Sequence, residues 1–161
     1  MEQLLVRIWP DAYKIAFAIL RERGLAEDAA QEACASVLSS LPKLKNAAAF
    51  PSWSYKIVVH RALAIARKRP HLIDESAVDH DAASDWTQTI DLHAAMARLR
   101  PPQRAAIVLR YYAGFDSAQI AAALRIPAST VRFHLAQARR ALHDALSFGR
   151  DTGEENVSDV R

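Results

Sequence analysis

Apolar residues recur along this chain at the spacing of amphipathic helices. The sustained alternation of β-branched residues that predicts strands is absent from the sequence. We therefore expect an all-α protein, in which Pro10 can interrupt the first helix and Gly24 caps its end. The expected helices span residues 3–22, 26–41, 52–68, 90–99, 102–113, 117–124 and 128–146.

The expected helix 128–146 combines a regular apolar stripe with an aromatic side chain outside it. At about 100° per residue, the stripe occupies one narrow sector of the helix. Phe133 and Arg140 point almost directly away from that sector, so a large aromatic lies on the polar face. The stripe itself consists of Val131, Leu135, Ala138 and Leu142.

Hydrophobic residues make up 51% of the 161 residues, which is enough to build the core of one domain or of two small ones. No apolar run approaches the roughly 20 residues that a membrane span needs, and charged residues interrupt the N-terminus where a signal peptide would be apolar. We therefore expect a cytoplasmic chain without a membrane span. The single cysteine, Cys34, excludes an internal disulfide framework and is expected in the core.

Charge divides the chain into blocks. Residues 1–69 carry 11 basic and 6 acidic side chains, and residues 98–150 carry 9 basic and 2 acidic ones. Between them, residues 70–97 carry 6 acidic and no basic side chains, and residues 151–161 carry 1 basic and 4 acidic ones. Two basic helical modules joined by an acidic linker suggest a protein that touches an extended polyanion at two places. The alternative is that the basic residues only solvate helix faces.

A specific local pattern precedes the helix with the outward-facing aromatic. Asp116 and Gln119 form a variant of the capping box for a short helix, and Pro127 can open the next helix after the connection RIPAS. This pattern predicts a helix-turn-helix, whose second helix lies in the DNA major groove. An ordinary antiparallel helix pair is the alternative. DNA is favoured by the polar residues on the outer surfaces of the second helix, which are Arg132, His134, Gln137, Arg139 and Arg140.

Separate segments of the chain resemble one family, in the right order. Residues 99–146, from LRPPQRAAIVLRYYAGFDSAQ to the end of STVRFHLAQARRALHDAL, resemble region 4 of bacterial RNA polymerase sigma factors. LAEDAAQEACASVL (25–38) and WSYKIVVHRALAIARKR (53–69) resemble region 2. With these two regions alone, the chain is similar to the extracytoplasmic-function (ECF) group. The resemblance implies two small helical domains joined by a flexible acidic linker: a region 2 bundle at 1–69, the linker at 70–88, a region 4 helix-turn-helix domain at 89–148 and a polar acidic tail at 149–161.

The resemblance implies an alternative sigma factor, which directs core RNA polymerase to promoters and assists their opening without catalytic residues or cofactors. Its implied partners are the β′ clamp helices and the β flap of core polymerase, promoter DNA and an anti-sigma factor. Glu27 and Asp28 are also expected in a first helical turn, where the macrodipole favours acids without any partner. In sigma factors the AED..QE helix docks on the clamp helices, which assigns core binding to Glu27, Asp28, Gln31 and Glu32.

The helix that begins near Trp53 resembles the element that recognises and opens the minus-ten region. Opening the promoter requires cationic side chains on the phosphates and stacking faces or pockets for unpaired bases. Trp53 is not expected to supply such a stacking face, because it is expected in the core. Family members commonly carry Asn at the position of His60 and Asp at the position of Ala64, so this chain departs from the pattern there. Minus-ten binding is assigned to Asn46, Tyr55, Lys56, His60, Arg61, Arg67 and Lys68.

The second helix of the helix-turn-helix is the implied reader of the minus-thirty-five element. On its outward face, the ring of Phe133 can contact a thymine methyl group, and packing on an anti-sigma partner is the alternative. Arg125 takes the position where the family commonly has glycine, and a left-handed conformation there costs about 1 kcal/mol relative to glycine. Minus-thirty-five binding is assigned to Ser129, Thr130, Arg132, Phe133, His134, Gln137, Arg139 and Arg140.

The acidic linker can stand in for RNA among the basic walls of the polymerase exit channel, as the resemblance implies, or act only as a solvated tether. Its acids are Asp74, Glu75, Asp79, Asp81 and Asp85. Two alternatives to a sigma factor stay open: a DNA-binding regulator that does not join polymerase, and a purely protein-binding helical module. Because nothing fixes their geometry, no metal is expected at His71, His80 and His93.

Overall fold

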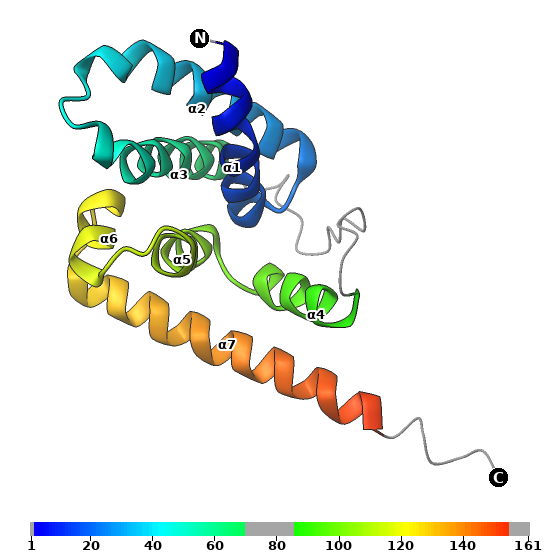
Figure 1. Ribbon diagram of the computed structural model, residues 1–161. Helices are drawn as coiled ribbons and strands as arrows, with labels where there is room; N and C mark the ends of the chain where they lie inside the picture. The colour runs from blue at the N-terminus through cyan, green and yellow to red at the C-terminus, as the bar shows by residue number, and fades with distance from the viewer. Residues whose placement is uncertain (1, 70–85, 155–161) are drawn as a thin grey trace.

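The computed structural model describes residues 2–69 and 86–154, and helices dominate both ranges (Figure 1). No strand occurs in these ranges, which confirms the all-α prediction. The acids of the expected linker, and with them His71 and His80, lie outside the described residues. In chain order the elements are α1 (Glu2–Leu20), α2 (Arg23–Ser40), the short 3-10 helices η1 (Leu41–Lys43) and η2 (Ala47–Ala49), α3 (Phe50–Lys68), α4 (Trp86–Ala97), α5 (Pro101–Ile107), the π-helix η4 (Val108–Tyr112), α6 (Ser117–Leu124) and α7 (Ala128–Glu154).

The first three α-helices form a bundle at one end of the molecule (Figure 1). α2 packs against α1 and α3 through a face built largely of alanine, whose short side chains let helices approach closely. Cys34 belongs to this face and is 3% exposed, which confirms it as a core residue, and burial raises the pKa of its thiol. The buried residues of α2 are Leu25, Ala26, Ala29, Ala30, Ala33, Cys34 and Val37.

Pro10 does not interrupt α1, although the sequence allowed a break there. The helix continues through it to Leu20. A proline within a helix removes the N–H that would bond to the carbonyl four residues earlier, here that of Val6. Val6 is 69% exposed, so water can satisfy this carbonyl and the helix persists.

The prediction that Gly24 caps the end of α1 is wrong. Arg21 follows the last residue of α1 in the left-handed conformation, with φ of 60°, and its N–H donates to the Phe17 carbonyl at 2.8 Å. Gly24 lies inside α2, near a start that Glu22 caps. The Glu22 carboxylate accepts the N–H groups of Gly24 at 2.9 Å and of Leu25 at 2.6 Å. The tertiary structure decides this boundary, because the Arg21 side chain is buried against α4.

The expected helix 102–113 is two elements in the structure. α5 gives way to the π-helix η4, in which the N–H of Ala113 reaches the carbonyl of Val108, five residues earlier, at 3.1 Å. Widened turns of this kind are rare and occur often at functional sites. η4 carries Tyr111 and Tyr112, which are 63% and 48% exposed.

The helix-turn-helix forms as predicted from α6 and α7. Asp116 Oδ1 accepts the N–H of Gln119 at 2.8 Å, and Gln119 Oε1 accepts the N–H of Asp116 at 2.9 Å, which confirms the capping box. Arg125 ends α6 with φ of 56°, which confirms the left-handed conformation expected at the glycine position. Pro127 immediately precedes α7, and α7 extends beyond the expected end at 146.

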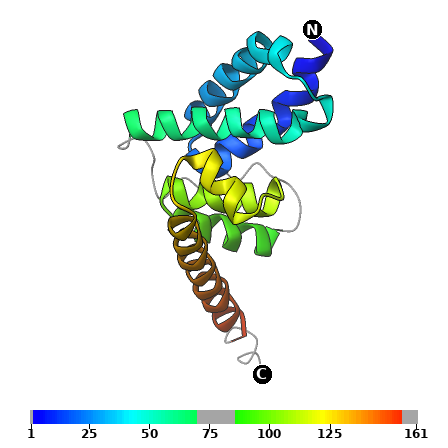
Figure 2. The ribbon, with the colours of Figure 1, turned by 90° about the vertical axis from the view of Figure 1, so that its left-hand side faces the viewer.

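The two helical units pack on one another. α5 lies against α1 and α3, and α6 lies directly beneath α3 when the molecule is turned (Figure 2). Buried apolar residues from both units belong to one continuous cluster. Within the described ranges, no helix has the length and apolar character needed to cross a membrane.

Replacing Arg125 with glycine should stabilise the protein. The left-handed backbone costs an L-residue roughly 1–2 kcal/mol, whereas the extra chain entropy of a glycine costs about 0.5–1 kcal/mol. We expect Arg125→Gly to raise the free energy of unfolding by up to about 1 kcal/mol, measured by urea denaturation. Arg125→Ala is the matched control, because it removes the same side chain and keeps Cβ. An equal gain in both variants would contradict the backbone explanation.

Candidate polymerase and DNA interfaces

α2 presents a polar face opposite its buried alanines. All four residues assigned to core binding are exposed on this helix, so the structure brings them to one side of the bundle. Positions three and four apart are neighbours on a helix surface, and their side chains can jointly accept hydrogen bonds from a basic partner. We call this surface the acidic face, and it consists of Glu27, Asp28, Gln31 and Glu32.

The helix macrodipole does not account for these acids. α2 begins at Arg23, so Glu27 and Asp28 lie beyond its first turn. The macrodipole effect falls off within one turn, and the N–H groups at the helix start are already bound by Glu22. The alternative drawn from the sequence is therefore wrong for this pair.

The residues assigned to minus-ten binding fall into two groups. Arg67 and Lys68 are exposed in the last turn of α3, and exposed Arg61 donates from Nη2 to Ser36 Oγ at 2.9 Å. Asn46 caps η2 by accepting the N–H of Ala48 at 3.0 Å. The second group faces the C-terminal unit and consists of Tyr55, Lys56 and His60.

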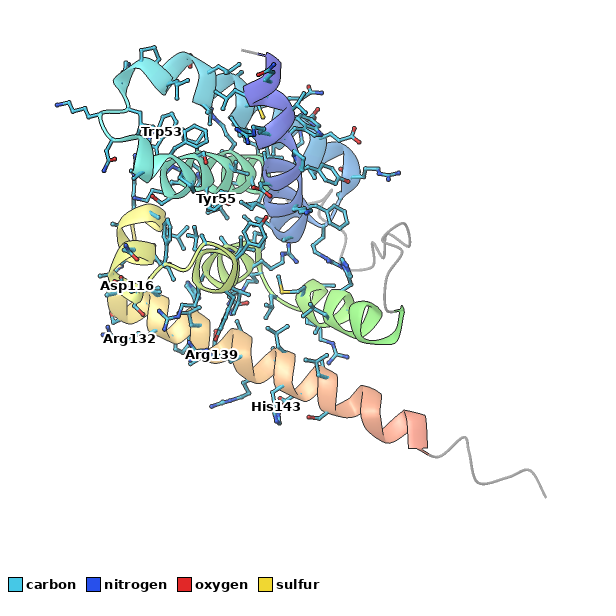
Figure 3. All side chains as sticks on the ribbon, viewed as in Figure 1. Trp53, Tyr55, Asp116, Arg132, Arg139 and His143 are labelled. Carbon is cyan, nitrogen blue, oxygen red and sulfur yellow. The ribbon has the colours of Figure 1, made fainter. Side chains whose placement is uncertain are left out.

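Trp53 belongs to the packed side of α3, as predicted. It is half-buried against the core, and its ring centroid lies 6.0 Å from that of Phe50. Figure 3 shows Trp53 on α3 above Tyr55, which lies closer to the C-terminal unit. The ring centroid of Tyr55 lies 5.8 Å from that of Tyr112, so Tyr55 is in contact with the C-terminal unit.

The C-terminal unit covers part of α3 through polar and cationic contacts. Lys56 Nζ lies 5.5 Å from the ring centroid of Phe115, within reach of a cation–π interaction. His60 Nε2 donates to the carbonyl of Ala123. The histidine that departs from the family pattern is therefore a contact between the two units in this arrangement.

Asp11 on α1 joins two tyrosines from the two units. Tyr112 Oη donates to Asp11 Oδ1 at 2.8 Å, and Tyr55 Oη donates to Oδ2 at 3.5 Å. Burial is the largest cause that raises the pKa of both phenols, and the Asp11 carboxylate raises them further by favouring the neutral form. The pKa of Tyr112 reaches about 12, so its hydroxyl remains a donor at neutral pH.

Two buried arginines complete the contact between the units. Arg104 Nε donates to the carbonyl of Ile19 at 2.7 Å, and its Nη1 donates to that of Leu99 at 2.9 Å. Arg21 donates to Nδ1 of His93 at 2.8 Å and to the carbonyl of His93 at 2.9 Å. These contacts were not predicted from the sequence. The one signal for them in the sequence was the position of Arg104 directly before the apolar run 105–109, which indicates a buried arginine.

α7 offers an exposed face on the side away from the core. Phe133 is 57% exposed, and its ring centroid lies 6.3 Å from that of His134. Thr130 and His134 are half-buried at the edges of this face. Figure 3 shows Arg132 and Arg139 along the same helix. The exposed residues assigned to minus-thirty-five binding are Ser129, Arg132, Phe133, Gln137, Arg139 and Arg140.

Two of the assigned residues are engaged within the chain. Gln137 Oε1 accepts from Gln103 Nε2 at 3.0 Å. Arg139 Nε donates to Tyr111 Oη at 2.8 Å, so its side chain turns toward η4 at the edge of the α7 face. The sequence spacing of α7 could not reveal either contact, because both partners come from α5 and η4.

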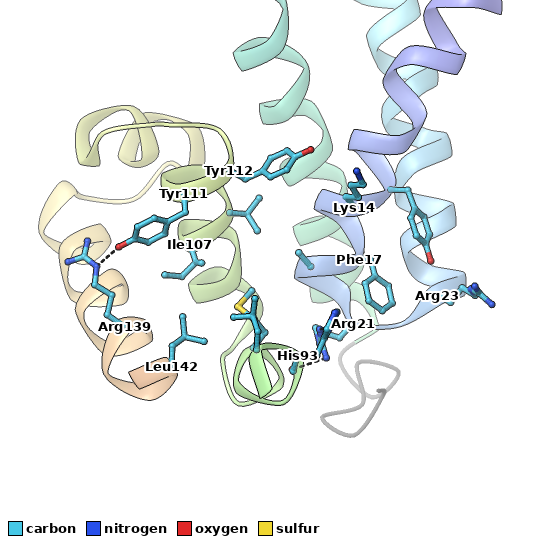
Figure 4. Close-up of a pocket in the computed structure, with 15 residues that line it drawn as sticks. Lys14, Phe17, Arg21, Arg23, His93, Ile107, Tyr111, Tyr112, Arg139 and Leu142 are labelled. Atoms are coloured by element: carbon cyan, nitrogen blue, oxygen red, sulfur yellow. Dashed lines mark hydrogen bonds between the residues drawn. The ribbon is translucent and has the colours of Figure 1, made fainter. Parts of the chain in front are cut away.

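A groove of about 820 Å³ runs between the two units (Figure 4). Aromatic and aliphatic side chains form most of its surface, and Arg139 and Tyr111 close one side through their hydrogen bond. Four cationic side chains lie along it, which are Lys14, Arg21, Arg23 and Arg139. The groove therefore combines an apolar floor with positive charge.

The structure offers no cluster of metal ligands within the ranges it describes. No group of three or more His, Cys, Asp or Glu side chains there could hold a metal ion. His93 instead accepts the hydrogen bond from Arg21.

A helix-turn-helix packed on a three-helix bundle defines a class: a helical DNA-binding protein of the helix-turn-helix kind. Comparison with known families is specific. Residues 5–70 match the family described as Sigma-70 region 2, and residues 89–142 match Sigma-70, region 4. The chain belongs to the sigma-70 family and is an RNA polymerase sigma factor of the ECF group.

Individual relatives agree with this assignment. The chain is 27% identical to RNA polymerase sigma factor SigV of Bacillus subtilis (strain 168) over 141 residues, which cover 85% of each protein. It is 27% identical to the RNA polymerase sigma-H factor of Pseudomonas aeruginosa over 75% of this chain and 72% of the relative. A solved structure, sigma factor RpoE in complex with the anti-sigma factor NepR from Bartonella quintana, is similar with a TM-score of 0.73. At 22% identity over 91% of this chain and 96% of that one, it shows a shared fold.

Removing the Tyr112 hydroxyl should change the pH dependence of stability. The folded-state pKa of about 12 exceeds the unfolded value near 10, so the contribution of Tyr112 is complete below about pH 10 and is lost as pH rises through about 12. We expect Tyr112→Phe to lower the free energy of unfolding by a constant amount up to about pH 9, with the difference shrinking above it. Urea denaturation across pH measures this difference.

Tyrosinate absorbance supplies an independent readout for the same prediction. The wild-type protein should show a late-titrating tyrosine that Tyr112→Phe lacks. Asp11→Asn keeps the size of its side chain and removes the charge, so it should shift that titration to lower pH. A stability difference that stays constant through the whole alkaline range would contradict the role assigned to Tyr112.

Proposed function

We propose that this protein is an alternative sigma factor that binds core RNA polymerase, brings it to specific promoters and assists their opening. The observation that carries the proposal is the pairing, in one chain of the sigma-70 family, of the acidic face on α2 with the exposed face of α7. α2 and α7 lie at opposite ends of the molecule (Figure 1), so both can be occupied together. The factor works by binding and not by covalent chemistry, and it acts in the cytoplasm, where polymerase and DNA meet.

The acidic face docks on the β′ clamp helices in this proposal, and the C-terminal unit contacts the β flap. Two observations support the first contact. All four side chains are exposed, and α2 begins at Arg23, so Glu27 and Asp28 lie too far along the helix to cap its start. The division into 1–69, 70–88, 89–148 and 149–161 is part of the proposal, with α7 extending into the last segment.

Promoter recognition uses two helices. The α7 face enters the major groove at the minus-thirty-five element, where helix-turn-helix proteins place their second helix. α3 binds the minus-ten region with its cations on phosphates and Tyr55 as a stacking face. Because Tyr55, Lys56 and His60 contact the C-terminal unit, we propose that the two units separate when the protein joins core polymerase.

An anti-sigma factor is the proposed regulator. The solved structure with the similar fold is a complex with an anti-sigma factor. The groove between the two units supports such a partner here, because its apolar floor suits an amphipathic segment and Lys14 and Arg139 on its walls suit acidic residues in that segment. Occupying the groove would hold the units together and keep Tyr55, Lys56 and His60 covered.

Reconstitution with core polymerase tests the function. Run-off transcription on genomic fragments should yield defined start sites that depend on this protein. A protein that binds specific DNA but neither joins core polymerase nor starts transcripts is a DNA-binding regulator, and that outcome would overturn the proposal. A protein that does none of these and binds only other proteins is the third alternative.

Charge reversal on the acidic face should weaken core binding. Asp28→Lys combined with Glu32→Lys places two cations where the partner is expected to be basic, and like-charge contacts at an interface cost several kcal/mol. We expect at least about a tenfold loss of affinity for core polymerase by fluorescence anisotropy, or about 1.4 kcal/mol. Asp144→Lys reverses a charge outside the acidic face, on α7, so it should lower the affinity for core polymerase less than the double variant does. Unchanged affinity in the double variant would remove the docking assignment.

Phe133 should contribute to sequence-specific binding. Phe133→Ala removes the ring that contacts a thymine methyl, so affinity should fall more for the cognate minus-thirty-five duplex than for a random duplex. Circular dichroism confirms that the exposed substitution leaves the fold intact. An equal loss on both duplexes would instead assign Phe133 to folding or to a protein partner.

A further inference from the structure

The side-chain amide of Gln103 has only one possible orientation. Gln103 is 8% exposed, at the third position of α5, and its Oε1 accepts the backbone N–H of Arg100 at 2.9 Å. A backbone N–H is always a donor, so the oxygen and not the nitrogen of the amide fits opposite it. Nε2 of Gln103 therefore points the other way, as a donor.

This donor determines the orientation of a second amide, on α7. Gln103 Nε2 donates to Oε1 of Gln137 at 3.0 Å. The amide nitrogen of Gln137 cannot accept a hydrogen bond, so the donor Nε2 of Gln103 must face the amide oxygen of Gln137. The backbone N–H of Arg100 thus orients Gln137 through Gln103, and the NH₂ group of Gln137 is left on the side away from Gln103.

Gln137 lies on the outward face of α7. It is exposed and follows Phe133 by four positions, so the two side chains are neighbours on the helix surface. Among the described residues, the bond from Gln103 is the one hydrogen bond of its side chain. Gln137 therefore presents hydrogen-bond donors to whatever this face contacts.

We propose that Gln103 is a positioning residue that makes Gln137 a donor, and that Gln137 thereby selects guanine at one base pair of the minus-thirty-five element. The proposal rests on the proposed function, in which the α7 face lies in the major groove. Guanine presents two adjacent acceptors there, N7 and O6, within reach of one NH₂ group. Cytosine presents a donor, adenine sets a donor beside its acceptor, and thymine presents one acceptor, O4, beside its methyl group, so guanine alone offers two acceptors to the NH₂ group. A glutamine without this constraint reads adenine, because it offers one donor and one acceptor.

The variant Gln103→Glu inverts the polarity of this chain of hydrogen bonds. A glutamate at this position still accepts the N–H of Arg100, as in a capping box. Its second oxygen is now an acceptor toward α7, so Gln137 turns its NH₂ group inward and presents Oε1 outward. An outward acceptor selects the exocyclic amino groups of cytosine or adenine in place of guanine.

The experiment is a selection from a random duplex library with the full-length chain, followed by sequencing of the bound fraction. It is run at about pH 8, where a carboxyl group is ionised. The wild-type protein should enrich guanine at one position, and Gln103→Glu should lower the ratio of guanine to cytosine and adenine there by about tenfold or more. Preferences at the other positions should stay the same in both proteins.

Two further variants keep the test decisive. Gln137→Ala should abolish the base preference at that one position, and replacing its guanine with 7-deazaguanine should then cost no affinity, although it weakens the wild type. In Gln103→Met the new side chain donates no hydrogen bond, so Oε1 of Gln137 is again available as an acceptor for DNA. The preference for adenine at that position should therefore rise relative to the preference for guanine. Thermal unfolding confirms that each variant is folded.

The outcomes separate this proposal from the proposed function. If the wild-type chain enriches a motif but Gln137→Ala changes no position, or if folded Gln103→Glu and Gln103→Met keep the guanine preference, the role of Gln103 is overturned and the sigma factor assignment stands. If the wild-type chain enriches no motif and starts no transcripts with core polymerase, the proposed function fails first.

Discussion

The buried guanidinium of Arg104 holds the arrangement of the two units. It donates to the Ile19 carbonyl in the last turn of α1 at 2.7 Å and to the Met96 carbonyl near the end of α4 at 3.4 Å. It also donates to the Leu99 carbonyl, in the turn that follows α4, at 2.9 Å. Carbonyls at helix ends lack partners within the helix and carry the negative end of the macrodipole, so a buried cation is well placed there. A side chain that is 2% exposed thereby satisfies carbonyls from both units and joins them at the centre of their contact.

This packing decides which surfaces are available. The acidic face on α2 and the outward face of α7 remain exposed, whereas the middle of α3 is covered by the C-terminal unit. On α3, Lys56 contacts Phe115 and His60 contacts the carbonyl of Ala123. Tyr55 of α3 shares the Asp11 carboxylate with Tyr112. Under the proposed function, polymerase docking and minus-thirty-five reading are compatible with the closed arrangement, whereas the use of Tyr55, Lys56 and His60 at the minus-ten region requires the two units to separate. Each polar contact between the units contributes only about 1 kcal/mol against such a separation.

Much of the fold was predictable because its signals are local. The Asp116 capping box and the left-handed Arg125 depend on residues within a few positions of one another, and both were predicted correctly. The break that the sequence allowed at Pro10 does not occur, and the Gly24 cap was predicted wrongly, because the exposure of Val6 and the burial of Arg21 against α4 decided those boundaries. The resemblance also led to the correct family, since two motifs in the right order are far more specific than one helix-turn-helix.

The sequence by itself determined the helices, the helix-turn-helix, the face on which Phe133 lies and the family, because periodicity, capping and motif spacing are all written within single segments. Only the tertiary structure decided how those faces are used. It placed α3 against α6, turned Arg139 toward Tyr111, and linked Gln103 to Gln137 across 34 positions of chain. The physical reason is that hydrogen-bond polarity passes between side chains in space. What a residue such as Gln137 offers to DNA therefore depends on a neighbour that no local pattern reveals.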